Sequence, residues 1–248
     1  MTGLRVGGLA PFSTVDLPGR TAAVVFCLGC PWRCRYCHNA HLRGERAEPP
    51  LDWGGILRWL EPRQGFLEAV VFSGGEPLVQ PALPQAVAEV KAMGFAVGLH
   101  TGGSSPDTLR RLLPLIDWIG LDIKAPRAAY DRITGVAGSG RAAWEALGFA
   151  LGSSVPYEIR TTCHPDLLTE SDLGTLAREL AGAGAMNWVL QPFRPQGCQD
   201  QALVTSRTAR PARALVDGLA ALFLGQGTPH PPARRPGTGT GGRSFLAR

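Results

Sequence analysis

The chain has 248 residues, 44% hydrophobic and 18% charged, which is enough to bury the core of one large domain. Its formal charge of +5 would suit a nucleic-acid-binding protein. However, the last 24 residues carry four arginines and no acid, which leaves +1 for residues 1–224. A nearly neutral body argues against a phosphate-binding face, so we expect no nucleic-acid partner.

Neither a leader nor a membrane span is visible in the sequence. The first residues, MTGLRVGGLAPF, lack a charged lead before a long apolar run. No stretch approaches the roughly 18 apolar residues of a membrane span. We therefore expect a cytoplasmic protein with no membrane partner. Thiols stay reduced in that compartment, so a group of cysteines there favours metal binding or catalysis over disulfides.

Short apolar runs alternate with longer helix-like stretches along the first 224 residues. The strand-like runs span residues 22–27, 69–73, 95–100, 118–123, 157–162 and 188–191. The helix-like stretches lie near residues 54–60, 81–93, 106–113, 141–151, 171–183 and 209–223. This alternation predicts an α/β fold of parallel strands covered by helices. About six units fit, which favours a partial (β/α)6 TIM-like barrel, with a doubly wound open sheet as the alternative.

Each predicted strand ends in polar or glycine-rich residues. These segments are 30–39, 73–77, 100–103, 122–124, 160–163 and 191–194. In a parallel barrel the carboxyl ends of the strands share one rim, where active sites lie. We therefore expect six segments that are distant in sequence to line one cavity.

The last segment, residues 225–248, differs in composition from the rest. It contains six Gly, four Pro and almost no large apolar side chains. Such a segment buries too little surface to offset its chain entropy. The sequence thus predicts one domain over residues 1–224 and a disordered tail over residues 225–248.

Four cysteines lie within eleven positions: Cys27, Cys30, Cys34 and Cys37. A structural zinc site normally joins two Cys-x-x-Cys turns across a spacer longer than the three residues between Cys30 and Cys34. An electron-transfer cluster with a remote fourth ligand, Cys163 or Cys198, would be unusual in a long β/α chain. The third interpretation is a [4Fe–4S] cluster held by three cysteines, with one iron open to a small molecule.

The spacing Cys30-x3-Cys34-x2-Cys37, with Tyr36 before the last cysteine and His38-Asn39 after it, resembles the radical S-adenosylmethionine (SAM) superfamily. The segment SGGEP at residues 73–77, after the next strand, is similar to that family's second motif. The resemblance implies a partial barrel of the radical SAM type, with one [4Fe–4S] cluster and SAM as cofactors. It also implies that Cys27 is not a ligand and behaves as a small buried hydrophobe.

The resemblance further implies the chemistry. The open iron would chelate the amino and carboxylate groups of SAM, and one electron would break a sulfur–carbon bond. The resulting 5′-deoxyadenosyl radical would abstract a hydrogen atom, while the protein orients the reactants. Gly74 and Gly75 would let the backbone approach the methionine part of SAM, with Glu76 beside it, so that a side chain at Gly75 would project toward SAM. The alternative for SGGEP is a strand-ending turn without a ligand.

Five more SAM contacts are implied residue by residue. Tyr36 and His38 would flank the adenine with their backbone. Asp122 and Lys124, in LDIK, match a strand motif at the ribose and carboxylate, and Arg160, in EIRTT, matches a basic residue near the SAM carboxylate. The alternatives are a simple strand-end ion pair for Asp122 and Lys124, and a solvated edge charge for Arg160.

Within the superfamily, four segments resemble the glycyl-radical-enzyme activating proteins: FSTVDLPG at residues 12–19, the cysteine block, SGGEPLVQ and LDIKAP. The cysteine block is most similar to the activating protein of anaerobic ribonucleoside-triphosphate reductase. This implies a glycyl radical enzyme as partner and a one-electron donor such as flavodoxin or ferredoxin. The alternatives are a radical SAM enzyme acting on a small molecule, of the modified-base pathway type, and a non-catalytic metal-binding or electron-transfer protein.

The chain also departs from the activating proteins. Some of them carry Asp-Thr at the third strand end, where the acid helps to hold a monovalent cation, but here the pair is His100-Thr101. A pyruvate formate-lyase activating protein has histidine where this chain has Arg194. Residues 40–66 contain no cysteine, so we expect a single cluster.

Overall fold

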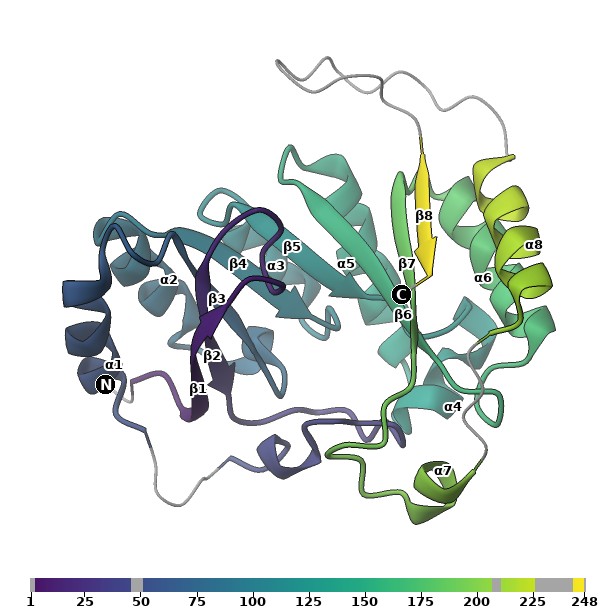
Figure 1. Cartoon of the computed structure of the whole chain (residues 1–248), viewed down its shortest axis with the longest axis horizontal. Coiled ribbons are helices and arrows are strands. Elements are labelled where there is room, and N and C mark those ends of the chain that lie inside the picture. The colour runs from purple at the N-terminus through teal and green to yellow at the C-terminus, as the bar shows by residue number, and fades with distance from the viewer. Residues whose placement is uncertain (1–2, 46–50, 207–210, 226–242, 248) are drawn as a thin grey trace.

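The computed structural model describes residues 3–45, 51–206, 211–225 and 243–247. Its core is one eight-stranded sheet in the order β1 to β8 (Figure 1). Strands β2 to β8 run parallel to their neighbours, and β1 is antiparallel to β2. The two edge strands do not pair in the described part of the chain. The predicted α/β partial barrel is therefore confirmed, and the barrel is not closed.

The strands are β1 Val6–Ser13, β2 Ala22–Cys27, β3 Ala69–Gly74, β4 Ala96–Thr101, β5 Trp118–Asp122, β6 Tyr157–Cys163, β7 Asn187–Pro192 and β8 Ser244–Ala247. The α-helices are α1 Trp53–Leu60, α2 Leu83–Ala92, α3 Pro106–Leu112, α4 Tyr130–Thr134, α5 Ser139–Gly152, α6 Glu170–Gly182, α7 Gln201–Thr205 and α8 Arg213–Leu224. Single 3-10 turns span Ala40–Leu42, Glu61–Arg63, Pro77–Val79 and Arg127–Ala129. The six predicted strands correspond to β2 to β7. None of the described helices is both long and apolar enough to cross a bilayer.

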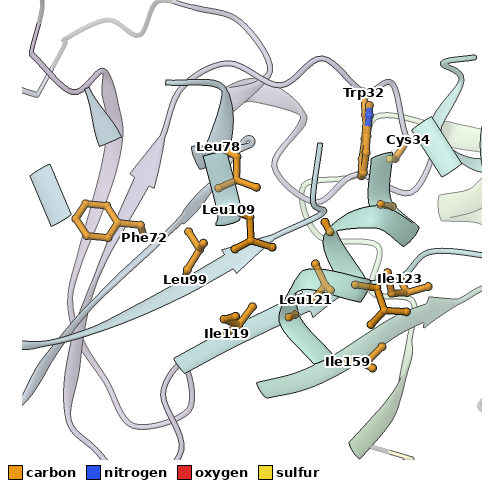
Figure 2. Close-up of a cluster of buried hydrophobic side chains, with 14 of the residues drawn as sticks. Trp32, Cys34, Phe72, Leu78, Leu99, Leu109, Ile119, Leu121, Ile123 and Ile159 are labelled. Carbon is orange, nitrogen blue, oxygen red and sulfur yellow. The ribbon is translucent and has the colours of Figure 1, made fainter. Parts of the chain in front are cut away.

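The main core lies between the sheet and its helices. Alternate strand residues point to the helical face, and Figure 2 shows them in a row from Phe72 through Leu99 and Ile119 to Ile159, with Leu109 of α3 packed nearby. Fully burying one such side chain contributes about 1.5–3 kcal/mol. This row fixes the register of the parallel strands, and with it the position of every strand end.

A smaller cluster fills the opposite face of the sheet near the start of the strands. Leu17, from the connection between β1 and β2, packs there against Val24, Val71 and Trp118. A side chain at Gly98 would meet this leucine, since its Cβ would lie 3.1 Å from a Leu17 methyl. The connection therefore covers one end of this face of the sheet.

The C-terminal strand β8 differs from the sequence-based expectation of a disordered tail. β8 lies beside β7 at the edge of the sheet (Figure 1) and pairs with it in parallel. Phe245 packs on Trp188 with ring centroids 4.9 Å apart. The Arg243 guanidinium donates to three main-chain carbonyls, of Ala181, Ala185 and Phe223. The strand was not predicted because the segment around it is rich in Gly and Pro. Residues 226–242 of the tail lie outside the described residues.

Candidate active site

A cavity of about 600 Å³ lies at the carboxyl ends of β3 to β7, beside the loop that follows β2. Its volume is typical of sites for small molecules and cofactors. Every site residue predicted from the sequence lines this cavity: Cys30, Cys34, Tyr36, Cys37, His38, Gly74, Gly75, Glu76, Asp122, Lys124 and Arg160. The topology thus brings together segments that are up to 130 positions apart in the chain.

The cysteine loop presents three of its thiols to the cavity. Cys30 and Cys37 are half-buried and Cys34 is buried. Burial raises the pKa of Cys30 to about 12 and also raises that of Cys34, so both thiolates need nearby positive charge. Cys27 is fully buried in the core at the end of β2. Cys163 and Cys198 are also buried and do not line the cavity.

Among the described residues, no three His, Cys, Asp or Glu side chains, Cys30, Cys34 and Cys37 included, are gathered as they would be around one metal ion.

The SGGEP segment packs directly against the cysteine loop. Asn39 Nδ2 donates to the Gly74 carbonyl at 3.1 Å, and the Gly75 amide donates to the Cys27 carbonyl at 2.9 Å. Gly74 has φ +108°, in the region that favours glycine. A Cβ at Gly75 would lie 2.4 Å from the Gly29 carbonyl oxygen. The expectation that a Gly75 side chain would project toward a ligand is therefore wrong, because it would meet the cysteine loop.

Glu76 links the same segment to the end of β4. Its buried carboxylate accepts hydrogen bonds from the Thr101 hydroxyl at 2.5 Å, the Gly102 amide at 2.9 Å and the Leu78 amide at 3.1 Å. Burial raises the pKa of Glu76, and these hydrogen bonds oppose that effect. Glu76 lines the cavity, and it also fixes the shape of the cavity wall.

Asp122 and Lys124 form the ion pair that was the alternative interpretation, and both also line the cavity. Lys124 Nζ lies 3.1 Å from Asp122 Oδ2, and the lysine side chain is 12% exposed. Burial acts to lower the pKa of Lys124, but the Asp122 carboxylate, followed by Tyr36 and Cys34, raises it well above its usual range. The ammonium group also lies 5.8 Å from the ring centroids of both Trp32 and Tyr36. Lys124 is therefore a buried cation enclosed by one carboxylate and two aromatic rings.

Arg160 lies on the inner face of β6. Its Nε donates to Glu158 Oε1 at 3.0 Å, and its side chain is 12% exposed. The guanidinium is 5.0 Å from the Trp118 ring centroid and fills the space over Gly120, where a Cβ would lie 2.6 Å from its Cζ. The alternative of a solvated edge charge is therefore wrong.

His100 lies next to Arg160 on the inner face of β4. Its Nε2 is 2.8 Å from the Asp16 carbonyl oxygen, to which it donates, and 3.3 Å from Arg160 Nη2. Burial, reinforced by the Arg160 charge, lowers the pKa of His100 to about 4. The imidazole is therefore neutral at pH 7 and supplies no negative charge for a cation.

His38 contains a buried polar atom without a hydrogen-bond partner. The Nε2 of this half-buried ring is enclosed but makes no hydrogen bond among the described residues. The ring lies 5.7 Å from that of Phe193, and burial lowers the pKa of His38. Buried polar atoms are rarely left unpaired, so an unpaired one beside a cavity suits a site that holds a ligand.

Sequence reasoning did not single out every lining residue. Val15 and Asp16 come from the β1–β2 connection, and Trp32 comes from the cysteine loop. The FSTVDLPG segment was the available signal for the first two, because it preceded the cysteine block without an assigned role. The other additional lining residues come from predicted strand ends and their adjoining loops: Asn39, Ser73, His100, Thr101, Gly102, Thr162, Gln191, Pro192 and Arg194.

Comparison with known families decides what kind of site this is. The sequence model of the radical SAM superfamily matches residues 24–180, which include the cysteine loop, SGGEP and the strands through β6. The chain belongs to the radical SAM superfamily. Radical SAM proteins use a [4Fe–4S] cluster and SAM. The residues present here fit both groups, since three thiols, the donors that iron–sulfur clusters use, adjoin a cofactor-sized cavity.

Several relatives within the superfamily are similar to this chain. A protein of Methanocaldococcus jannaschii, provisionally named a glycyl-radical enzyme activating enzyme, is 28% identical over 79% of this chain and 82% of its own. The pyruvate formate-lyase-activating enzyme of Clostridium pasteurianum is 31% identical over 53% of this chain and 57% of its own. The 7-carboxy-7-deazaguanine synthase of Methanopyrus kandleri is 31% identical over 44% of this chain and 51% of its own.

Solved structures share the fold. Streptococcus suis SuiB bound to its precursor peptide SuiA superposes with a TM-score of 0.67 at 11% identity, covering 91% of this chain and 48% of that one. QueE from Escherichia coli gives a TM-score of 0.52 at 18% identity, covering 80% and 89%. This chain thus spans about half the length of SuiB and of two of the three relatives above. At these identities the structural likeness concerns the radical SAM fold alone.

Proposed function

We propose that this chain is a radical SAM activating enzyme that generates a glycyl radical on a partner enzyme. Cys30, Cys34 and Cys37 hold its single [4Fe–4S] cluster, and Cys27 is not a ligand. When bound and reduced, the cluster would supply one electron to SAM, and the products would be methionine, 5′-deoxyadenosine and a partner whose glycine has lost its Cα hydrogen atom. We place this reaction in the cytoplasm.

In this proposal the other predicted residues bind and orient SAM. They are Tyr36, His38, Gly74, Gly75, Glu76, Asp122, Lys124 and Arg160. Tyr36 and His38 adjoin the adenine, and the SGGEP backbone meets the methionine ammonium. The ion pair of Asp122 and Lys124 adjoins the ribose and carboxylate. The low exposure of Lys124 and Arg160, 12% for each side chain, supports the proposal, because hydrogen bonds to charged groups are strongest where water is excluded.

The observation that carries the activating function is the relative matched across most of both chains. That relative is named as a glycyl-radical enzyme activating enzyme, and the match covers 79% of this chain. The open barrel is consistent with a protein loop as substrate, since β1 and β8 leave the sheet unclosed in the described residues. The cysteine block favours anaerobic ribonucleoside-triphosphate reductase as the partner. Flavodoxin or ferredoxin would supply the electron.

Electron paramagnetic resonance tests this function. The reconstituted chain is incubated anaerobically with SAM, a reductant and the candidate reductase, and a glycyl radical signal is expected on the reductase. A Cys34→Ala chain, treated in the same way, should give no signal. SAM cleavage without a radical on the reductase would exclude this partner, and a parallel incubation with pyruvate formate-lyase examines the other activating type. Absence of SAM cleavage would support the non-catalytic alternative.

A second candidate is a radical SAM enzyme acting on a small molecule of a modified-base pathway. The 31% identity to a 7-carboxy-7-deazaguanine synthase supports it. Such an enzyme would leave both glycyl radical enzymes without a signal. It would instead consume SAM faster when a low-molecular-mass substrate is added.

A further inference from the structure

The Lys124 ammonium lies close to two aromatic rings of the cysteine loop and has little contact with solvent. Lys124 follows β5, and its Nζ is held 3.1 Å from Asp122 Oδ2. The same ammonium lies 5.8 Å from the ring centroids of Trp32 and Tyr36, both of which are buried. Enclosure by two rings and one carboxylate leaves it little contact with solvent, so water screens its charge weakly.

The two rings place this charge relative to the cysteines. Trp32 stands between Cys30 and Cys34 in the sequence, and Tyr36 stands between Cys34 and Cys37. An ammonium 5.8 Å from both ring centroids therefore lies beside the two side chains that flank Cys34 in the loop.

A buried cation beside an iron–sulfur cluster alters its redox equilibrium. Reduction adds one negative charge to a cluster that already carries three thiolates, and a fixed positive charge nearby stabilises the reduced form. Net charge and solvent exposure are among the factors that set the reduction potentials of such clusters. The Lys124 ammonium supplies the charge, and its burial keeps the interaction from being screened.

Two acids near the loop act in the opposite direction. Asp122 is paired with Lys124, and Glu76 is buried just after β3 and lines the same cavity as Cys30. Glu76 is held by hydrogen bonds from Thr101, Gly102 and Leu78, which partly compensate its charge. The charge beside the Cys34 part of the loop therefore comes from the pair of Lys124 and Asp122.

We propose that Lys124 raises the reduction potential of the [4Fe–4S] cluster and that Asp122 moderates this effect. The inference deepens the proposed function and rests on its three-cysteine ligation. It is separate from the proposed contact of Lys124 with SAM, because it applies to the cluster before SAM binds. Lys124 would act through its charge alone, and the reduction potential of the cluster reports this effect without any catalytic turnover.

A redox titration of the full chain without SAM tests the proposal. Wild type, Lys124→Met, Lys124→Arg and Asp122→Asn are reconstituted anaerobically, and the reduced cluster is followed by electron paramagnetic resonance. At the wild-type midpoint, Lys124→Met should show a ratio of reduced to oxidised cluster about tenfold lower, equivalent to 59 mV for one electron. Lys124→Arg should stay close to wild type, because it keeps the charge. Asp122→Asn should shift the ratio the other way.

Lys91→Met provides the matched control. Lys91 also pairs with an aspartate, Asp117, at 2.9 Å, but both side chains are more than a third exposed and the pair lies at α2 and β5, outside the cavity lining. Its loss should leave the midpoint unchanged. Iron and sulfide analysis of every variant confirms that only chains containing a cluster are compared. If Lys124→Met binds no cluster, Lys124→Gln is used in its place.

The outcomes separate this inference from the proposed function. Equal midpoints for wild type and cluster-loaded Lys124 variants would overturn the inference alone. Shifts of the same sign in Lys124→Met and Asp122→Asn would also overturn it, since they would reflect general disturbance instead of charge. A wild-type chain that binds no iron would overturn the three-cysteine site and this inference together.

Discussion

Single residues around the cavity both line it and determine its shape. Glu76 faces the cavity while its oxygens accept three hydrogen bonds from the β3–β4 region, and Arg160 faces it while paired with Glu158. Such dual roles follow from burial, because a charge that cannot reach water must be paired. Substitutions at these positions therefore change the shape of the cavity wall as well as ligand binding. Residues with a single role give tests that are easier to interpret.

The cysteines offer such a test. Cys30→Ala, Cys34→Ala and Cys37→Ala should each abolish cluster assembly, whereas Cys27→Ala should retain it. Cys27 is fully buried in the core, so its loss should instead reduce stability modestly. Iron and sulfide analysis of the four purified chains measures the outcome. Loss of iron only in Cys27→Ala would contradict the assignment.

Gly75→Val should prevent cluster assembly. A Cβ at this position would lie 2.4 Å from the Gly29 carbonyl oxygen and 3.0 Å from that of Leu42. These contacts are with backbone atoms, so no side-chain rotation can relieve them. The cysteine loop must therefore shift, which changes the distances between its thiols. Iron content per chain, measured beside a melting curve, is the readout.

Gly148→Ala is the matched control for that substitution. Gly148 lies within α5, and a Cβ there would meet no atom within 4 Å. Replacing a helical glycine by alanine stabilises by roughly 0.5–1 kcal/mol, so iron content should stay normal. A Gly75→Val chain with full iron would mean that the loop accommodates the side chain.

His100 should make stability depend on pH. Burial lowers its pKa from 6.5 to about 4 in the folded chain. Between these values the unfolded chain binds a proton that the folded chain does not, so stability is full above pH 6.5 and declines as the pH falls toward 4. The expected loss between pH 7 and 5 is about 2 kcal/mol. Urea unfolding at both pH values should show a smaller loss in His100→Gln; equal losses would refute this origin.

At the scale of elements, the sequence predicted the interior of the fold better than its edges. Strands β2 to β7 are apolar runs followed by polar ends, and the same pattern places those ends at one rim. β1 contains two glycines and a proline, which obscure its strand character, and β8 lies in a segment dominated by Gly and Pro. Both segments form strands because the neighbouring edge of the sheet offers unpaired main-chain N–H and C=O groups. The sequence of the segment itself does not show that such an edge is nearby.

The close approach of the two motifs was also beyond sequence reasoning. The glycines of SGGEP indicated that something lies near the backbone, but not whether a ligand or another loop. The structure places Gly29 against Gly75, and Asn39 against Gly74. A glycine in the sequence can indicate that another group packs closely against the backbone, but it does not identify that group. The direction of a side chain at Gly75 could therefore not be predicted.

The attachment of β8 predicts that Arg243 stabilises the fold. Its guanidinium donates to the carbonyls at the end of α6, after α6 and at the end of α8. Hydrogen bonds from a charged donor contribute about 1.5–3 kcal/mol, so Arg243→Ala should lower stability by about 2 kcal/mol. For a chain of this size that corresponds to a fall in Tm of about 4–8 °C.

A surface arginine serves as the control for this prediction. Arg213 pairs with Asp217 along α8, but its side chain is 89% exposed. Exposed pairs of this kind contribute about 0.3–0.5 kcal/mol, so Arg213→Ala should leave Tm nearly unchanged. Equal melting curves for Arg243→Ala and wild type would show that β8 adds nothing to stability.

At the scale of the whole molecule, the cavity joins parts of the chain that are distant in sequence. The lining residues belong to the β1–β2 connection, to the cysteine loop and to the ends of β3 to β7 with their adjoining loops. The main core runs through the same strands, so the described chain has no separate core for either half of the cavity. A ligand bound there would contact most of the sheet at once and should stabilise the fold as one unit.

SAM should therefore raise the melting temperature of the reconstituted chain in a single transition. At a SAM concentration of 100 times Kd, linkage gives about 2.7 kcal/mol of stabilisation. For a chain of this length the corresponding rise in Tm is about 5–11 °C. Calorimetry under anaerobic conditions measures it, and a Cys34→Ala chain, which should lack the cluster that chelates SAM, should show a much smaller rise. Two transitions, of which SAM moves only one, would mean that the cavity joins two independently folding parts instead of one cooperative barrel.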